Sequence, residues 1–261
     1  MRHGTSECHV QTVHASRGTS CFEGHLEPFF FLRATRLVAV FAISLACASA
    51  ADVIESHHAQ HDFAPTADPD SREWKNVKGV TATKDFLGKP VPGFDTQIRS
   101  RWTDRCLYLL YISPYRELNL KPNPSTTTET DHLWDWDVAE AFIGTDFNHI
   151  GRYKEFEVSP QGEWVDLDID FDHPKQQIGE AWNSGFQVKA RVDAEKKIWY
   201  AEMKIPMSQI DSRTPRVGLE MRVGLYRIAG ANPNRIFMAW QPTMHKSFHV
   251  PSAFGILRLA K

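Results

Sequence analysis

Apolar and polar residues alternate with a period of two along most of the chain after residue 76, which is typical of half-buried β-strands. In the segment 163–171, for example, one face is apolar and the other carries Trp164 followed by aspartates. The pattern predicts strands over residues 77–83, 95–103, 105–113, 136–144, 152–159, 163–171, 186–193, 197–205, 217–229, 235–241 and 254–260. No sustained helical period occurs, although 206–211 can form one helical turn because it begins with Pro206.

The spacing of these strands predicts the fold class. Turn signals separate them, such as Ser-Pro-Gln-Gly at 159–162 and Asp-Ala-Glu-Lys at 193–196. Many short strands at regular intervals favour an all-β fold, and we expect a single antiparallel β-sandwich.

The N-terminal part differs from the rest of the chain. Arg33 and Arg36 precede a short apolar run, 37–50, that ends in Ala-Ser-Ala, the pattern of a secretory signal peptide. A short membrane anchor or a lipid anchor at Cys47 are the alternatives. We therefore expect an N-terminal extension plus signal at 1–50, a polar linker at 51–71 and the folded domain at 72–261. The mature protein is predicted to be secreted or periplasmic, with no membrane span.

Composition and charge narrow the choice of partners. The chain has 261 residues, of which 42% are hydrophobic, and a formal net charge of −2. This balance is typical of a globular domain and argues against nucleic acid as a partner. Four cysteines are present, but only Cys106 lies in the expected mature domain, and its apolar neighbours predict a small buried side chain. Eight tryptophans are a surplus that must be buried or used for recognition.

The familiar signatures of catalysis are missing. The chain contains no glycine-rich phosphate loop, HExxH, GxSxG or paired-cysteine motif. We therefore expect no catalytic activity from this chain by itself.

Metal ligands are only weakly indicated, and no cofactor is required by the pattern. The acids Asp166, Asp168 and Asp170 have the spacing of a calcium loop, but Phe171 stands where that loop needs glycine. They are candidates for calcium, and the alternative is a solvated outer strand face. A histidine-rich tract at 57–61 is open to the same two interpretations, a metal site or a solvated tail.

Sugar recognition is the chemistry that the tryptophans suit best. The apolar face of a pyranose ring stacks on indole, while its hydroxyl groups bind carboxylates, amides and guanidinium groups. Trp134 follows a long polar loop, 119–132, and is expected to face a ligand, whereas Trp136 is expected in the core. Glu140 shares the alternate face of Trp136 and Val138, where a buried carboxylate needs a partner.

Four motifs together resemble family 9 carbohydrate-binding modules. They are WDWDVAEAF at 134–142, RYKEFEVSPQGEW at 152–164, WYAEMKIP at 199–206 and FGILRL at 254–259. The resemblance extends over residues 72–260. It implies a jelly-roll-like sandwich, related also to DOMON-type domains, that binds a mono-, oligo- or polysaccharide. The family is associated with O-glycosyl hydrolases, so the resemblance also implies a link to polysaccharide use.

The resemblance also implies roles for particular residues. Trp134 takes the position of one sugar-clamping tryptophan, Trp240 that of the other, and Glu140 that of the hydroxyl acceptor. Trp136 departs from the signature, which has aspartate there. Further polar contacts and a further aromatic platform are expected, with less support, from Asn232, Asn234, Arg235 and Trp182.

Two other functions remain open from the sequence. Haem-binding redox domains share this sandwich type, and their iron is held by methionine with histidine or lysine. The side chains that fit this role are Met221, Met238, Met244, His245, Lys246 and His249, and without CxxCH the haem would be non-covalent. The third function is that of an interaction domain in a larger envelope assembly.

Overall fold

The computed structural model describes residues 52–173 and 182–261. The expected signal peptide at 1–50 lies outside the described residues, as does Ala51. Within the described ranges, no helix has the length and apolar character that crossing a membrane requires.

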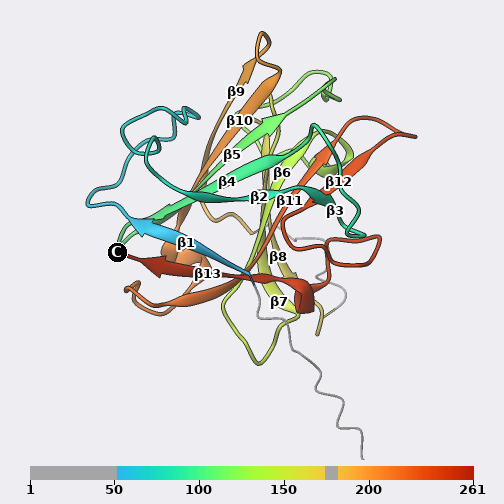
Figure 1. Ribbon diagram of the computed structural model, residues 1–261. Coiled ribbons are helices and arrows are strands. Elements are labelled where there is room, and N and C mark those ends of the chain that lie inside the picture. Colours follow the sequence, from blue (N-terminus) through green and yellow to red (C-terminus); the bar gives the residue numbers. More distant parts are fainter. Residues whose placement is uncertain (1–51, 174–181) are drawn as a thin grey trace, which may run out of the picture. The chain divides into compact units, whose positions relative to one another are not determined.

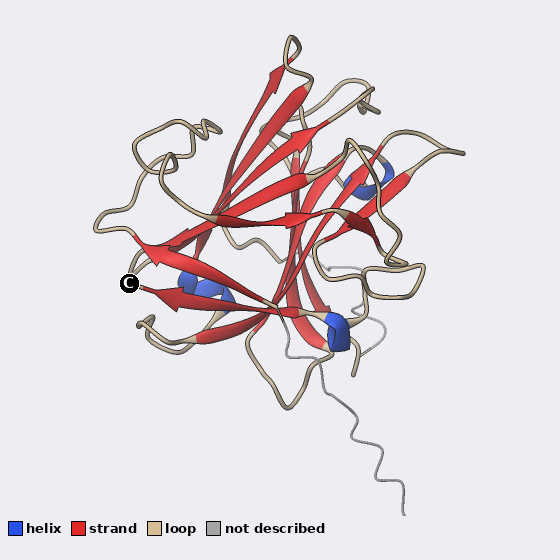
Figure 2. Ribbon diagram, in the orientation of Figure 1, coloured by secondary structure: helices blue, strands red, loops and turns tan. Residues whose placement is uncertain are grey.

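Strands make up nearly all of the regular secondary structure in the described residues, which confirms the predicted fold class (Figure 2). Each predicted strand segment overlaps an observed strand. The strands are β1 (Val53–His58), β2 (Gly79–Ala82), β3 (Lys84–Asp85), β4 (Thr96–Trp102), β5 (Cys106–Pro114), β6 (Val138–Gly144), β7 (Arg152–Val158), β8 (Trp164–Asp170), β9 (Gln187–Asp193), β10 (Ile198–Pro206), β11 (Glu220–Ala229), β12 (Ile236–Ala239) and β13 (Gly255–Ala260). The expected helical turn is α1 (Met207–Ile210), and the short 3-10 helices are η1 (Leu133–Asp135) and η3 (Pro251–Ala253).

The strands join in one continuous sheet, whose main path is β8-β7-β6-β11-β13-β1-β4-β5-β10-β9; off this path, β2 pairs with β4, and β12 pairs with β11 and β3. Figure 1 shows β1 beside β13, and β5, β10 and β9 in succession. The pairings along this path are antiparallel except at β1, which runs parallel to both β13 and β4. The sandwich is therefore as predicted, but one parallel strand links its two halves.

The main core lies between the two halves of the sheet. Ala139, Ala141 and Ile143 on β6 belong to the same buried cluster as Leu107 and Leu109 on β5. These residues recur every second position, which places them on one face of each strand. The intervening residues of β5 and β6 point away from this core, and other parts of the chain cover them.

The outer face of β5 and β10 is covered by residues 63–77. Trp74 is fully buried against Tyr108 and Leu110. Glu202 on β10 accepts hydrogen bonds from the backbone N–H groups of Thr66 and Ala67, both at 2.8 Å, and from Trp74 Nε1 at 2.9 Å. The segment that we expected to be a polar linker, 51–71, therefore supplies β1 and part of this cover. Cys106 is a buried free thiol beside this cluster.

The outer face of β6, β7, β8 and β11 carries a second apolar cluster, which includes Phe142 and Tyr226. Phe248 and Phe254 from the segment before β13 pack on it, together with Phe86. The candidate site lies on this outer face, between the strands and the covering segment that precedes β13.

Candidate functional site

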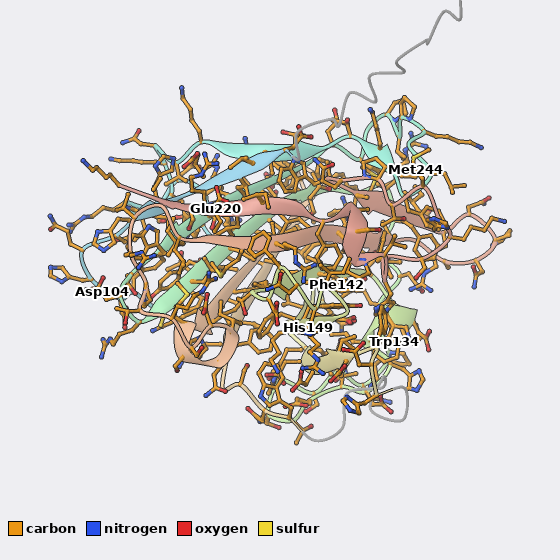
Figure 3. The ribbon with its side chains drawn as sticks, turned by 90° about the horizontal axis from the view of Figure 1, so that it is seen from below. Asp104, Trp134, Phe142, His149, Glu220 and Met244 are labelled. Atoms are coloured by element: carbon orange, nitrogen blue, oxygen red, sulfur yellow. The ribbon has the colours of Figure 1, made fainter. Side chains whose placement is uncertain are left out.

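A cavity of about 340 Å³ opens on the outer face of β6, β7 and β8. Its apolar walls come from Leu167 and Ile169 on β8 and from Phe237 and Phe248. Trp134 also lines it, and Figure 3 shows this residue in the same region as Phe142, far from Asp104. The polar residues of the lining are His132, Glu140, Glu155, Lys246, Ser247 and His249.

Trp134 is held at the cavity by the turn around it. It lies in η1, whose first residue, Leu133, is completely buried. Nη2 of Arg235 donates to the carbonyl oxygen of Trp134 and, at 3.3 Å, to that of Trp136. The predicted residue Arg235 therefore contacts the backbone that carries Trp134 and is absent from the cavity lining.

Trp136 is not the core residue that alternation predicted. It is half-buried and follows η1 as its C-cap, and β6 begins only at Val138. The 3-10 turn breaks the period of two before the strand starts, so Leu133 takes the anchoring position. A residue two places before a strand shares its face only if the extended backbone continues that far.

Glu140 lies in the middle of β6 and is 2% exposed. The sheet register places it opposite Glu157 on β7 and opposite Tyr226 on β11. One carboxylate oxygen from each of Glu140, Glu155 and Glu157 lies within 4.8 Å of the other two. We call these three residues the glutamate cluster.

The glutamate cluster lacks the hydrogen bonds that buried carboxylates normally have. One buried oxygen of Glu140, one of Glu155 and both of Glu157 have no partner in the described structure. The hydroxyl group of Tyr226 is also buried without a partner. An unsatisfied buried polar group costs about 1–3 kcal/mol, so such a group points to function rather than to stability.

Burial raises the pKa of all three carboxyl groups in the cluster. The pKa of Glu140 and that of Glu157 lie well above the ordinary glutamate value because of burial and then because of repulsion within the cluster. Burial raises the pKa of Glu155 to about 7. The pKa of Tyr226 is raised as well, first by burial and then by Glu140 and Glu155. Shifted carboxyl groups in a cavity are typical of functional sites.

His249 lies at the mouth of the cavity. Its Nδ1 is 2.6 Å from the hydroxyl oxygen of Tyr153 and 4.0 Å from Oε2 of Glu155. No sequence signal pointed to Glu155 or Glu157. The alternation within 152–158 does place both on one face of a strand, but only the pairing of β7 with β6 brings them to Glu140.

Trp240, the expected second clamp, does not line this cavity. It is half-buried against the main core. Its ring lies directly over Gly255, where an added Cβ would be 2.6 Å from Cζ3 of the indole. The aromatic residues that share the cavity with Trp134 are Phe237 and Phe248.

The other predicted contact residues lie elsewhere. Asn232 and Asn234 are exposed in the turn between β11 and β12. Trp182 packs on Phe156 with ring centroids 5.9 Å apart, and Nζ of Lys154 lies 4.5 Å from its ring centroid. Trp182 and Lys154 border a separate, charged surface hollow of about 590 Å³.

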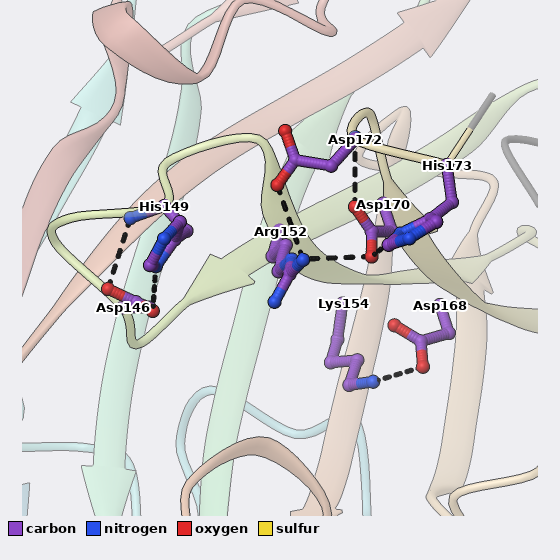
Figure 4. A network of polar contacts seen from close by, with 8 residues as sticks. All are labelled: Asp146, His149, Arg152, Lys154, Asp168, Asp170, Asp172 and His173. Carbon is purple, nitrogen blue, oxygen red and sulfur yellow. Dashed lines mark hydrogen bonds and ion pairs between the residues drawn. The ribbon is translucent and has the colours of Figure 1, made fainter.

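The aspartates considered for calcium each have a partner in the protein. Asp168 forms an ion pair with Lys154 at 2.5 Å, and Asp170 pairs with Arg152 at 3.3 Å and with His173 at 2.9 Å (Figure 4). Asp166 is buried and accepts a hydrogen bond from the backbone of residue 184. The register of β7 and β8 places Lys154 opposite Asp168 and Arg152 opposite Asp170, so the acids are neutralised in pairs across the strands.

The three methionines considered as haem ligands lie in different parts of the fold and do not form one site. Met221 and Met238 are fully buried in different core clusters, and Met244 is 65% exposed. Lys246 and His249 line the cavity of the glutamate cluster, but no methionine is among its described lining residues.

Comparisons with known proteins agree with this architecture. The family model for carbohydrate family 9 binding domain-like proteins matches residues 69–261. A protein of Arthroderma benhamiae named "Extracellular protein" is 26% identical over 189 residues, which are 64% of this chain and 78% of the relative.

Solved structures share the fold. A family 9 carbohydrate-binding module from Caldicellulosiruptor kristjanssonii in complex with cellotriose has a TM-score of 0.58 at 15% identity, covering 80% of this chain and 94% of the module. A proposed carbohydrate-binding protein from Bacteroides uniformis has a TM-score of 0.65 at 15% identity, covering 80% of this chain and 100% of that protein. The chain belongs to the carbohydrate family 9 binding domain-like family.

Proposed function

We propose that this domain binds a sugar in the cavity beneath Trp134. The observation that carries the proposal is the convergence of Trp134 with Glu140, a buried carboxylate without a partner, in one cavity of about 340 Å³. An indole face binds the C–H face of a pyranose, and a carboxylate accepts hydrogen bonds from its hydroxyl groups. The cavity volume falls within the range of small-molecule sites, about 300–1,000 Å³.

Two relatives support a sugar ligand and an extracellular location. The Caldicellulosiruptor kristjanssonii module was solved with cellotriose and also with glucose. The Arthroderma benhamiae relative is named as extracellular. We therefore propose a secreted, non-catalytic domain that contributes to polysaccharide use. N-terminal sequencing of the exported protein tests the location, with cleavage expected near Ala50.

Titration of the purified domain with glucose and cellotriose, by calorimetry and tryptophan fluorescence, tests the binding site. Trp134→Ala removes the stacking surface and Glu140→Gln the carboxylate. For each variant we expect Kd to rise at least tenfold, or about 1.4 kcal/mol. Phe147→Ala is the matched control, since Phe147 is exposed and outside the cavity lining.

Two results would contradict this proposal. If Trp240→Phe weakens binding as much as Trp134→Ala while both variants remain folded, the ligand binds elsewhere. If neither sugar nor a wider glycan panel changes the fluorescence, sugar binding itself is refuted.

A further inference from the structure

The glutamate cluster brings three buried carboxyl groups together without a matching cation. Among the described residues, the only cation-capable side chain within 4.0 Å of these carboxylates is His249, at the limiting distance of 4.0 Å from Glu155. The nearby guanidinium of Arg235 donates instead to backbone carbonyl groups. Carboxylates as buried as these are normally paired or bound to a metal ion.

The geometry of the cluster suits a hard divalent cation. Calcium binds oxygen ligands at about 2.3–2.6 Å, so two oxygens on one ion lie up to about 5 Å apart. The three carboxylates of the cluster offer oxygens that are all within 4.8 Å of one another. A set of oxygen donors favours calcium or magnesium over zinc or copper, and calcium tolerates the less regular geometry.

A second observation, from outside the acidic cluster, points to a ligand in the same place. Tyr226 pairs with Glu140 across β11 and β6, and its hydroxyl oxygen is buried without a hydrogen-bond partner. Cross-strand pairing places Tyr226 next to Glu140, and the charges of Glu140 and Glu155 add to burial in raising the pKa of its hydroxyl group. Its neutral oxygen is a further candidate donor, carried by the strand on the other side of Glu140 from Glu157.

We propose that Glu140, Glu155 and Glu157 bind a calcium ion at the floor of the cavity, and that hydroxyl groups of the sugar complete its coordination from the cavity side. Glu140 and Glu155 line the cavity, whereas Glu157, opposite Glu140 on β7, is not among the lining residues. A metal held on this floor is therefore open towards a ligand. The metal site is independent of the proposed function, and only the coordination of the sugar rests on that function.

The first test is calcium binding without sugar. The domain is stripped with EDTA, exchanged into chelator-free buffer and titrated with calcium chloride by calorimetry, with thermal melts in parallel. We expect one ion per chain and a higher Tm with calcium. Glu157→Gln should abolish both effects, because it removes a metal ligand that does not line the cavity.

The control is Asp168→Asn, which removes a carboxylate outside the cluster and should leave calcium binding unchanged. Glu157→Gln keeps the shape of the side chain and removes a repulsive charge, so it should remain folded in EDTA. Circular dichroism verifies this. The absence of binding heat and of a Tm shift in the unaltered protein at millimolar calcium would overturn the proposal.

The second test repeats the sugar titration in calcium and in EDTA. We expect affinity for the sugar to fall at least tenfold in EDTA, and Glu157→Gln to bind equally weakly in both buffers. Calcium binding without any sugar binding would refute the proposed function and leave the metal site intact. Equal sugar affinity in both buffers would refute the coordination of sugar by the ion.

Discussion

Glu140 and Glu202 are both buried glutamates, but their carboxylates differ in hydrogen bonding. Glu140 is 2% exposed and Glu202 is fully buried. Glu202 accepts hydrogen bonds from two backbone N–H groups and from Trp74 Nε1, so its carboxylate holds residues 66–74 against the sheet. Glu140 has a buried oxygen without a partner and faces a cavity. The first is structural and the second is available for a ligand.

This difference predicts that glutamine substitution lowers the unfolding free energy much more at Glu202 than at Glu140. Glu202→Gln places an NH₂ group against one of the present donors, which leaves a donor unsatisfied and should cost about 1–3 kcal/mol of unfolding free energy. Glu140→Gln replaces a carboxyl group whose pKa is raised by burial, and should cost little without ligand. Urea unfolding in EDTA measures both. A larger loss for Glu140→Gln than for Glu202→Gln would contradict these roles.

Asp137 predicts how stability depends on pH. It is fully buried and accepts a hydrogen bond of 2.6 Å from the backbone N–H of Gly230, yet burial raises its pKa to about 6. The folded state therefore holds a proton that the unfolded state has released between about pH 4 and pH 6. Stability from this group is present below that range and is lost as the pH rises through it.

We expect the decline in unfolding free energy from pH 4 to pH 7 to be smaller in Asp137→Asn than in the unaltered protein. The shift of roughly two units corresponds to at most about 3 kcal/mol. Urea unfolding at intervals of pH measures the difference. Parallel curves for the two proteins would show that Asp137 ionises normally.

Strand β1 connects the two halves of the sheet, because it lies between β13 and β4. It pairs in parallel with β13 through five residues and with β4 through two. Ile54 from β1 is buried in the main core. The family model begins only at residue 69, so β1 lies before the matched region.

Removal of β1 should therefore destabilise the domain. We compare a chain starting at residue 52 with one starting at residue 69. Loss of Ile54 from the core alone costs about 1.5–3 kcal/mol, and the lost strand pairing adds to it. With about 2–4 °C per kcal/mol for a domain of this size, a Tm decrease of at least about 5 °C is expected. Equal melting temperatures would show that β1 contributes nothing to the fold.

In the whole molecule, each half of the sandwich has an inner face on the shared core and an outer face covered by other segments. Residues 63–77 cover one outer face, and this cover is hydrogen-bonded to the sheet through Glu202. The segment around Phe248 covers the other, and there a cavity of about 340 Å³ remains. The same architecture thus produces a structural cover on one side and, on the other, the cavity that we propose as the sugar site.

The sequence by itself determined the strands and the all-β sandwich, and it marked Trp134 and Glu140 as candidate site residues. These depend on local patterns: a period of two for strands, and a signature in which the two candidate site residues are six positions apart. The alternation also marked Glu140 as an acid on a face that should be buried, and the structure confirms that burial.

Only the tertiary structure decided which other residues join them. Strand pairing brought Glu155, Glu157 and Tyr226 to Glu140, and parallel pairing with a strand some two hundred residues away ordered β1. The packing of Trp240 on Gly255 was likewise invisible in the sequence. Contacts between distant segments depend on register and on the path of the sheet, and neither is encoded in the local alternation of residues.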